Sequence, residues 1–276
     1  MSLACRKRYV LLVALACLGT AEARELRVCA DPNNLPFSDE NRAGFENRIV
    51  EIVANDLNAN VTYTWFAQRR GFLRNTLNAG VCDLVPGVPA GMDMLRTTRP
   101  YYRSSYVIVR QPNTPVIASL DDPALKRVKI GVQLIGSNGA NSPPVHELAR
   151  RGIVDNVRGF MIYGNCAGPA PAPPIISAVS SGEIDVAIVW GPPGGYFASK
   201  EIPPLEVEPL SSNGLNTQLP VTFDIAMGVR KREVELAAEI DRSLLRHRRE
   251  IDAILAAYRV PVPDGAYETT REREAQ

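Results

Sequence analysis

The fold is decided by Cys29-Ala30-Asp31-Pro32-Asn33-Asn34-Leu35-Pro36-Phe37 and by Gly44-Phe45-Glu46 a few residues later. The first stretch ends a run, Leu26 to Ala30, with the apolar pattern of a buried strand. Prolines and asparagines then break that pattern. Gly44-Phe45-Glu46 opens a segment whose apolar residues, Ile49 to Leu57, recur at helical spacing. The chain therefore starts with a strand followed by a helix, a βα unit.

Strand and helix patterns continue to alternate after this unit. Val61 to Phe66 and Leu84-Val85 are predicted strands, and Gly71 to Asn78 is a predicted helix between them. This βαβαβ order predicts a mostly parallel sheet with helices on both faces. A further strand is predicted at Tyr106 to Val109, and Gln111 to Pro115 then breaks the pattern. We interpret that break as the first crossing into a second domain.

The second domain repeats the alternation and then returns the chain to the first. Its predicted strands and helices are Val128–Val132, Val145–Arg151, Gly159–Tyr163, Ile175–Ser180 and Ile184–Trp190. Phe223 to Val229 is the predicted return strand, and two helices, about Glu233–His247 and Arg249–Tyr258, follow it. The predicted fold class is α/β. One lobe comprises residues 24–111 plus 223–262 and the other residues 112–222, with a central cleft where open α/β sheets bind ligands. Residues 263–276 form a polar tail.

The first 23 residues have the pattern of a secretory signal peptide. Arg6-Lys7-Arg8 is a charged segment, Tyr9 to Leu18 is too short to span a bilayer, and Ala21-Glu22-Ala23 is a cleavage site of small residues. We therefore expect a periplasmic protein with no membrane insertion after cleavage. Cleavage changes the net charge from +1 to about −1, which gives no electrostatic reason to expect nucleic acid as a partner.

Three cysteines, Cys29, Cys82 and Cys166, follow the predicted cleavage site. In an oxidising compartment Cys29 and Cys82 are candidates for a disulfide, because both fall in the first lobe. The alternative is a pair of buried thiols, since one cysteine near the end of a strand and one opening another strand can exceed the roughly 7 Å between Cα atoms that a disulfide spans.

Four stretches resemble the MxaJ/XoxJ family, and the order of segments along the mature chain resembles the type II periplasmic binding proteins. The stretches are Cys29 to Phe37, Gln68-Arg69-Arg70-Gly71-Phe72, Cys82-Asp83-Leu84-Val85-Pro86-Gly87-Val88-Pro89, and Arg99-Pro100-Tyr101-Tyr102-Arg103-Ser104-Ser105-Tyr106. The resemblance implies a type II periplasmic binding fold with two lobes joined by two chain crossings.

Family membership further implies a periplasmic accessory of a methanol dehydrogenase that depends on pyrroloquinoline quinone (PQQ), helping that enzyme to mature or become active. The dehydrogenase would be the partner, and its c-type cytochrome is a second candidate. The Mxa branch accompanies calcium-dependent enzymes and the Xox branch lanthanide-dependent ones. The motifs favour the Xox branch and leave the Mxa branch open.

Two departures from amino-acid-binding relatives bear on the ligand. Those proteins hold the ligand carboxylate with an arginine after the third strand, where this chain has Pro89-Ala90-Gly91. They hold the ammonium with an acid at the position of Trp190, which is followed here by a predicted Gly/Pro loop. A zwitterion without these counter-charges would be desolvated and unpaired. We expect no tight binding of free amino acids.

The predicted cleft is rich in aromatic and soft side chains, which suit a protein segment or a bulky ligand. For Trp65 a core position is an equal alternative. Arg69 and Arg70 are predicted to open a helix, where cations are disfavoured. Their placement is explained either by an internal pair with Asp31 or Glu46 or by a carboxylate of a partner. The candidate cleft residues are Asp31, Asn33, Asn34, Phe37, Trp65, Gln68, Arg69, Arg70, Met92, Gly136, Ser137, Trp190 and Tyr196.

The sequence gives no catalytic motif. The chain has two histidines, His146 and His247, in predicted polar helices, and no Gly-x-Ser-x-Gly, His-Glu-x-x-His or phosphate-binding loop. Asp121-Asp122 is too small for a calcium or lanthanide site, so no metal or cofactor is predicted. The predicted function is that of a non-catalytic accessory protein. The alternative is a transporter's solute-binding protein for a small ligand other than an amino acid.

Overall fold

The computed structural model describes residues 24–117, 119–135, 141–164, 166, 168, 170–210 and 219–263. The predicted signal peptide, the Gly136-Ser137 loop and the tail from residue 264 onward lie outside the described residues. Among the helices that are described, none is long and apolar enough to cross a membrane.

The chain starts with the predicted βα unit. β1 (Arg24–Ala30) pairs in parallel with β4 (Ala59–Trp65), and α1 (Phe45–Asp56) connects them and packs on β4. The small hairpin of β2 (Asn33–Asn34) and β3 (Ser38–Asp39) precedes α1. A Cβ at the helix N-cap, Gly44, would overlap the carbonyl oxygen of Phe37. Glycine at this position therefore lets α1 start directly against the hairpin.

Three short elements complete this part of the first lobe: α2 (Phe72–Asn75), β5 (Val85–Pro89) and β6 (Arg96–Thr97). The helix predicted from Gly71 to Asn78 is one turn long and starts at Phe72. β5 and β6 both pair antiparallel with a later strand, β12, and β1 reaches this region by a single parallel bridge from Val28 to Leu84. The strands of the predicted βαβαβ unit are parallel where they pair with one another, and β12 makes the sheets mixed by pairing antiparallel with β5 and β6.

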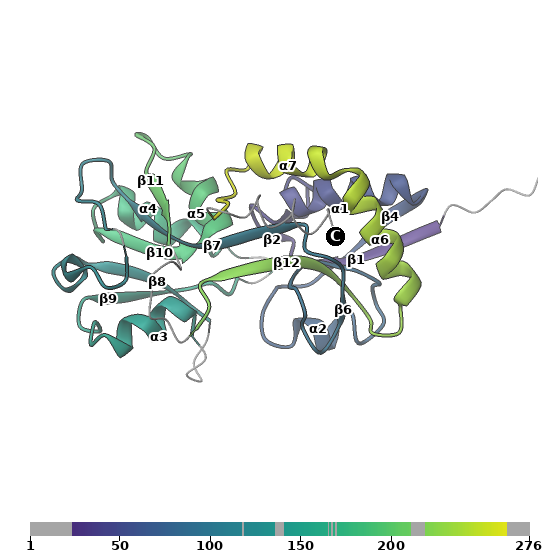
Figure 1. The fold of residues 1–276 in the computed structure, drawn as a ribbon, viewed down its shortest axis with the longest axis horizontal. Coiled ribbons are helices and arrows are strands. Elements are labelled where there is room, and N and C mark those ends of the chain that lie inside the picture. The colour runs from purple at the N-terminus through teal and green to yellow at the C-terminus, as the bar shows by residue number, and fades with distance from the viewer. Residues whose placement is uncertain are drawn as a thin grey trace, which may run out of the picture.

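Two long antiparallel strands, β7 (Tyr102–Arg110) and β12 (Thr222–Val229), run from one lobe into the other, as Figure 1 shows. Tyr102 and Ile225 pack in the hydrophobic core that contains α1, whereas Tyr106 and Val221 pack in the core of the second lobe. Phe223 packs against both cores. The chain thus passes between the cores within β7, ahead of the Gln111–Pro115 break that the sequence suggested.

The second lobe is a sheet in the order β7-β10-β8-β9, covered by helices. β8 pairs in parallel with both of its neighbours, as predicted, and the antiparallel β11 was not predicted. Its elements are the 3₁₀ turn η1 (Pro123–Lys126), β8 (Ile130–Leu134), α3 (Pro143–Arg150), β9 (Val157–Met161), α4 (Pro173–Ser180), β10 (Val186–Trp190), α5 (Gly191–Ala198) and β11 (Glu206–Pro209).

The segment after Trp190 corrects a prediction. The sequence suggested a Gly/Pro loop, yet Gly191 to Ala198 form helix α5, with Trp190 as its N-cap residue. Proline is tolerated in the first turn of a helix because the N–H groups there have no partner within the helix. Pro192 and Pro193 occupy that turn, so they do not interrupt α5.

Two C-terminal helices return to the first lobe, as predicted. α6 (Val234–Arg246) and α7 (Arg248–Ala257) both pack against α1. In Figure 1, α7 and α1 lie side by side along the upper edge of the molecule. The buried faces of these helices and of β1 share one hydrophobic core, with Val28, Phe45, Ile49, Ile240 and Ile251 at its centre.

Cys29 and Cys82 form a disulfide, with their Cα atoms 5.6 Å apart. The Cys29 N–H donates to the Leu84 carbonyl at 2.9 Å, so the segment entering β5 lies directly beside β1. This pairing brings Cys82 within bonding reach, and the distance objection raised from the sequence does not apply. Both cysteines are fully buried beside Phe72 and Val85.

Candidate functional site

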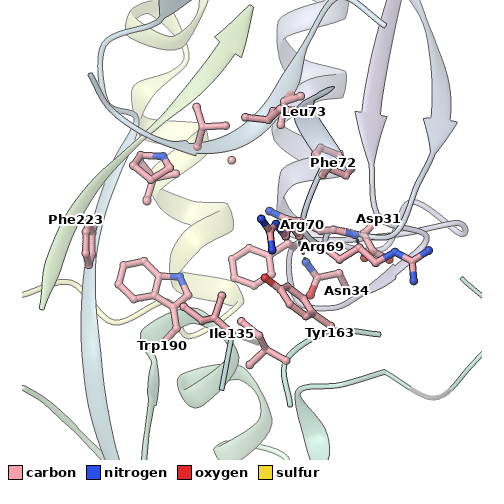
Figure 2. Close-up of a pocket in the computed structure, with 18 of the residues that line it drawn as sticks. Asp31, Asn34, Arg69, Arg70, Phe72, Leu73, Ile135, Tyr163, Trp190 and Phe223 are labelled. Carbon is pink, nitrogen blue, oxygen red and sulfur yellow. Dashed lines mark hydrogen bonds between the residues drawn. The ribbon is translucent and has the colours of Figure 1, made fainter. Parts of the chain in front are cut away.

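A cavity of about 820 Å³ lies between the two lobes. The first lobe contributes the β2–β3 hairpin, the Gln68–Arg74 turn and β5, and the second contributes the ends of β8, β9 and β10. The crossing strands β7 and β12 supply Tyr102, Tyr106, Phe223 and Ile225. Figure 2 shows Trp190 and Phe223 on one side of this cavity and Arg69, Arg70 and Asn34 on another.

The structure brings many of the predicted residues together in the lining of this cavity. They come from four separate segments of the sequence, and their common feature is a position at the end of a strand or in the turn after it. They are Asp31, Asn34, Phe37, Gln68, Arg69, Arg70, Met92 and Trp190.

Three predicted residues are not among the described residues that line the cavity. Trp65 stacks on Tyr63, with parallel rings 4.5 Å apart, on β4. Tyr196 lies on α5 and stacks on Tyr258 at 5.6 Å. Asn33 donates from its side chain to the carbonyl of Gly168, which joins the hairpin of one lobe to the other. Trp65 and Tyr196 are therefore corrected to positions outside the cavity.

Arg69 and Arg70 are exposed at the rim, in the turn before α2 rather than in its first turn. Neither forms an ion pair with a described carboxylate, so the internal pairing considered from the sequence is not found. Asp31, one of the suggested partners, instead accepts the backbone N–H groups of Asn33 at 2.9 Å and Gln68 at 2.6 Å. Its carboxylate shapes the hairpin and leaves the rim arginines free toward solvent.

Trp190 lies where the two lobes meet. Its ring packs edge-on against Tyr106 at 5.4 Å and Phe223 at 5.8 Å, one residue from each crossing strand. The backbone N–H of Trp190 donates to the side-chain oxygen of Gln133 at 2.9 Å, and this bond fixes the end of β10 against β8. Burial raises the pKa of Tyr106 to about 12, so its hydroxyl stays neutral. These rings form one aromatic wall of the cavity.

Sequence reasoning missed most of this wall. Tyr102 and Tyr106 are four residues apart on β7, and Phe223 lies on β12. Residues at i and i+4 of a strand share a face, so the spacing of the two tyrosines is a signal that the sequence does carry.

Glu46, in the first turn of α1, is one of two buried acids that line the cavity, the other being Asp31. Glu46 is 7% exposed, and its side chain forms no hydrogen bond or ion pair with a described residue. Burial raises its pKa to about 8. The backbone at Gly87 lies against this carboxyl, and a Cβ at position 87 would overlap Oε1. Tyr101 and Tyr102 lie close enough for the Glu46 charge to add to the burial that raises their pKa values well above 10.

No group of three or more His, Cys, Asp or Glu side chains that could hold a metal ion occurs among the described residues. The cavity offers aromatic surface, the two buried acids Asp31 and Glu46, and rim arginines. Those features suit binding of an organic group.

Comparisons with known proteins agree with this architecture. The chain is 31% identical over 252 residues to Protein MoxJ of Methylorubrum extorquens, covering 87% of this chain and 82% of that protein. The crystal structure of the periplasmic binding protein XoxJ from Methylobacterium extorquens AM1 superposes with a TM-score of 0.70 and 35% identity, covering 86% of this chain and 99% of XoxJ.

A third comparison bears on the fold alone. The crystal structure of MxaJ from Methylophaga aminisulfidivorans superposes with a TM-score of 0.74 at 24% identity, over 86% of this chain and all of MxaJ. No protein-family model matches the chain. The identity with MoxJ over most of both chains, together with the XoxJ structure, shows that the protein belongs to the MoxJ (MxaJ/XoxJ) family and has the type II periplasmic binding protein fold.

Proposed function

We propose that the protein is a periplasmic, non-catalytic accessory of a PQQ-dependent methanol dehydrogenase, and that it holds a segment of that enzyme in the cavity between its lobes. The observation that carries this proposal is similarity to MoxJ and XoxJ over most of the chain, together with the aromatic lining of the cavity. Large aromatic side chains bury much apolar surface and dominate the energetics of protein interfaces.

The arrangement of the cavity supports a protein segment as the ligand. Trp190 forms one wall of the cavity together with Tyr106 of β7 and Phe223 of β12, the two strands that cross between the lobes. A segment bound against this wall would therefore contact both lobes. Arg69 and Arg70 at the rim have no carboxylate partner among the described residues, and they would pair with acidic residues of the bound enzyme.

The proposed dehydrogenase is of the lanthanide-dependent, Xox type. Identity is 35% with XoxJ, against 31% with MoxJ and 24% with the MxaJ structure. The proposed compartment is the periplasm, reached through the signal peptide of residues 1–23, and the enzyme's c-type cytochrome is a second proposed partner.

A binding experiment with purified mature protein tests the cavity as the contact surface. Trp190→Ala is expected to weaken binding to a lanthanide-dependent methanol dehydrogenase at least tenfold, and Arg69→Ala to weaken it less. Trp65→Ala is the matched control, because Trp65 is the chain's other tryptophan and stacks on Tyr63 outside the cavity. Unchanged binding by both Trp190→Ala and Arg69→Ala would exclude the cavity as the contact.

Affinity capture of the tagged protein from the periplasm of methanol-grown cells tests the partner itself. Recovery of a quinoprotein dehydrogenase in stoichiometric amount is the expected result. Recovery of a bound metabolite or a transporter subunit, without the dehydrogenase, would overturn the accessory function in favour of a solute-binding one.

A further inference from the structure

The cavity contains one carboxyl group that the fold itself does not use. Glu46 is 7% exposed, yet no arginine, lysine or hydrogen-bond donor of the described chain pairs with it. Its oxygens are not among the unpartnered polar atoms sealed in the core, so they reach the cavity surface. Asp31, the other acid of the lining, differs because two backbone N–H groups satisfy it.

The surroundings of Glu46 are aromatic. The backbone N–H of Glu46 donates to the Phe37 carbonyl at 3.0 Å, so the two residues are neighbours along the backbone contact, and both line the cavity. Tyr102 lies on another side, close enough for its hydroxyl pKa to respond to the Glu46 charge. A carboxyl group beside aromatic faces is the combination that binds organic ammonium ions, through an ion pair and cation–π contacts.

We propose that Glu46 is the counter-ion for a primary ammonium group that enters the cavity between Phe37 and Tyr102. The group would bring the charge partner and the hydrogen-bond donors that the described residues do not supply to this carboxyl. Leaving a buried carboxylate unpaired is costly, so the ligand would stabilise the charged form of the acid.

A proton balance follows from this assignment. In the protein without a ligand, burial raises the pKa of Glu46 to about 8, so the carboxyl is largely protonated near neutral pH. An arriving ammonium ion favours the carboxylate, and one proton leaves to solvent. The titratable groups that face Glu46 are Tyr63 on β4, Tyr101 before β7 and Tyr102 on β7, and their raised pKa values keep them neutral.

The ammonium group has two possible sources. If the proposed function is correct, it is a lysine side chain of the dehydrogenase segment, and that part of the inference rests on the proposed function. The other source is a free alkylamine. Both present the same –NH₃⁺ group on a flexible apolar stem, so the chemistry at Glu46 is shared.

Calorimetric titration with n-butylammonium, the analogue of a lysine side chain, tests the proposal without any partner protein. Glu46→Gln should weaken n-butylammonium binding at least tenfold and leave n-butanol binding unchanged. Glu51→Gln is the matched control, on the same helix but outside the cavity, where Glu51 pairs with Arg42. Equal affinity of wild type and Glu46→Gln for n-butylammonium would overturn the proposal.

Proton release provides a readout on the unmodified protein, independent of how well the variant folds. Titrations at pH 7 in two buffers with different ionisation enthalpies should show release of nearly one proton per n-butylammonium bound. The affinity should rise up to about tenfold per pH unit between pH 6 and pH 8. A pH-independent affinity with no proton release would contradict the role of Glu46.

The source of the group is decided by a second pair of measurements. If a lysine of the dehydrogenase is the ligand, Glu46→Gln and acetylation of the dehydrogenase lysines should each weaken complex formation. If n-butylammonium binds through Glu46 but neither Glu46→Gln nor lysine acetylation weakens binding of the dehydrogenase, the ligand is a free amine. If the dehydrogenase binds in the cavity but n-butylammonium shows no dependence on Glu46, the ammonium assignment fails and the proposed function stands.

Discussion

The Glu46 carboxyl occupies the space that a side chain at Gly87 would need. A Cβ at position 87 would overlap Oε1 and contact the carboxyl carbon at 3.0 Å. The two residues come from the first turn of α1 and the middle of β5, so the buried acid is held between a helix start and a strand that line the same cavity.

Gly87→Ala is expected to destabilise the protein by about 1–3 kcal/mol, since an added methyl group would overlap the Glu46 carboxyl and force it to shift. Urea unfolding followed by circular dichroism measures the change. In a Glu46→Ala background the space is empty, and the same substitution should cost much less. Equal costs in both backgrounds would show that Glu46 is not what excludes a side chain at position 87.

The stability of the protein should depend on pH through Glu46. Burial raises the pKa of Glu46 from 4.5 to about 8, so the folded chain holds a proton that the unfolded chain loses between these values. The Glu46 contribution is therefore fully present below pH 4.5, falls by about 1.4 kcal/mol per pH unit as the pH rises, and levels off above pH 8.

The comparison of wild type with Glu46→Gln isolates this effect, because every other titrating group is common to both proteins. The variant should gain stability relative to wild type steadily from pH 5 to pH 8. A difference between the two that stays constant over this range would show that Glu46 keeps an ordinary pKa in the folded protein.

Much of the fold could be predicted because its helices and strands have clear periodicity. The segments now seen as α1, α6, α7, β4 and β8 each show it. Helix α5 was missed because glycine and proline usually break helices, whereas here the two prolines lie in its first turn. The passage between the lobes inside β7 was missed because a buried strand has the same apolar pattern in either core. The pattern therefore does not show where the strand leaves one core and enters the other.

The candidate site was predictable where it follows strand ends, as with Asp31, Phe37, Met92 and Trp190. It was not predictable where the outcome depends on packing across the chain. Periodicity places Tyr63 and Trp65 on one face of β4 but does not say that neither residue lines the cavity. Glu46 is visible in the opening motif, yet the sequence does not say that none of the described residues pairs with its side chain.

The disulfide should contribute roughly 4 kcal/mol to stability, because it closes a loop of 53 residues in the unfolded chain. Replacing both Cys29 and Cys82 by alanine is expected to lower the free energy of unfolding by about that amount and to make it insensitive to reductant. Cys166→Ser is the control, since Cys166 is exposed and unpaired and should be neutral. If dithiothreitol leaves the wild-type unfolding curve unchanged, the bond is not formed in solution.

The chain's two tryptophans, Trp65 and Trp190, allow occupation of the cavity to be followed by fluorescence. Trp190 lines the cavity and contacts Tyr106 and Phe223, so a ligand there should change its emission. Trp65 stacks on Tyr63 outside the cavity and should not respond. We therefore expect the ligand-dependent signal to persist in Trp65→Phe and to vanish in Trp190→Phe, with the affinity in Trp65→Phe equal to that of wild type. The reverse result, a signal lost with Trp65 and kept without Trp190, would move the binding surface to the Tyr63–Trp65 face of β4.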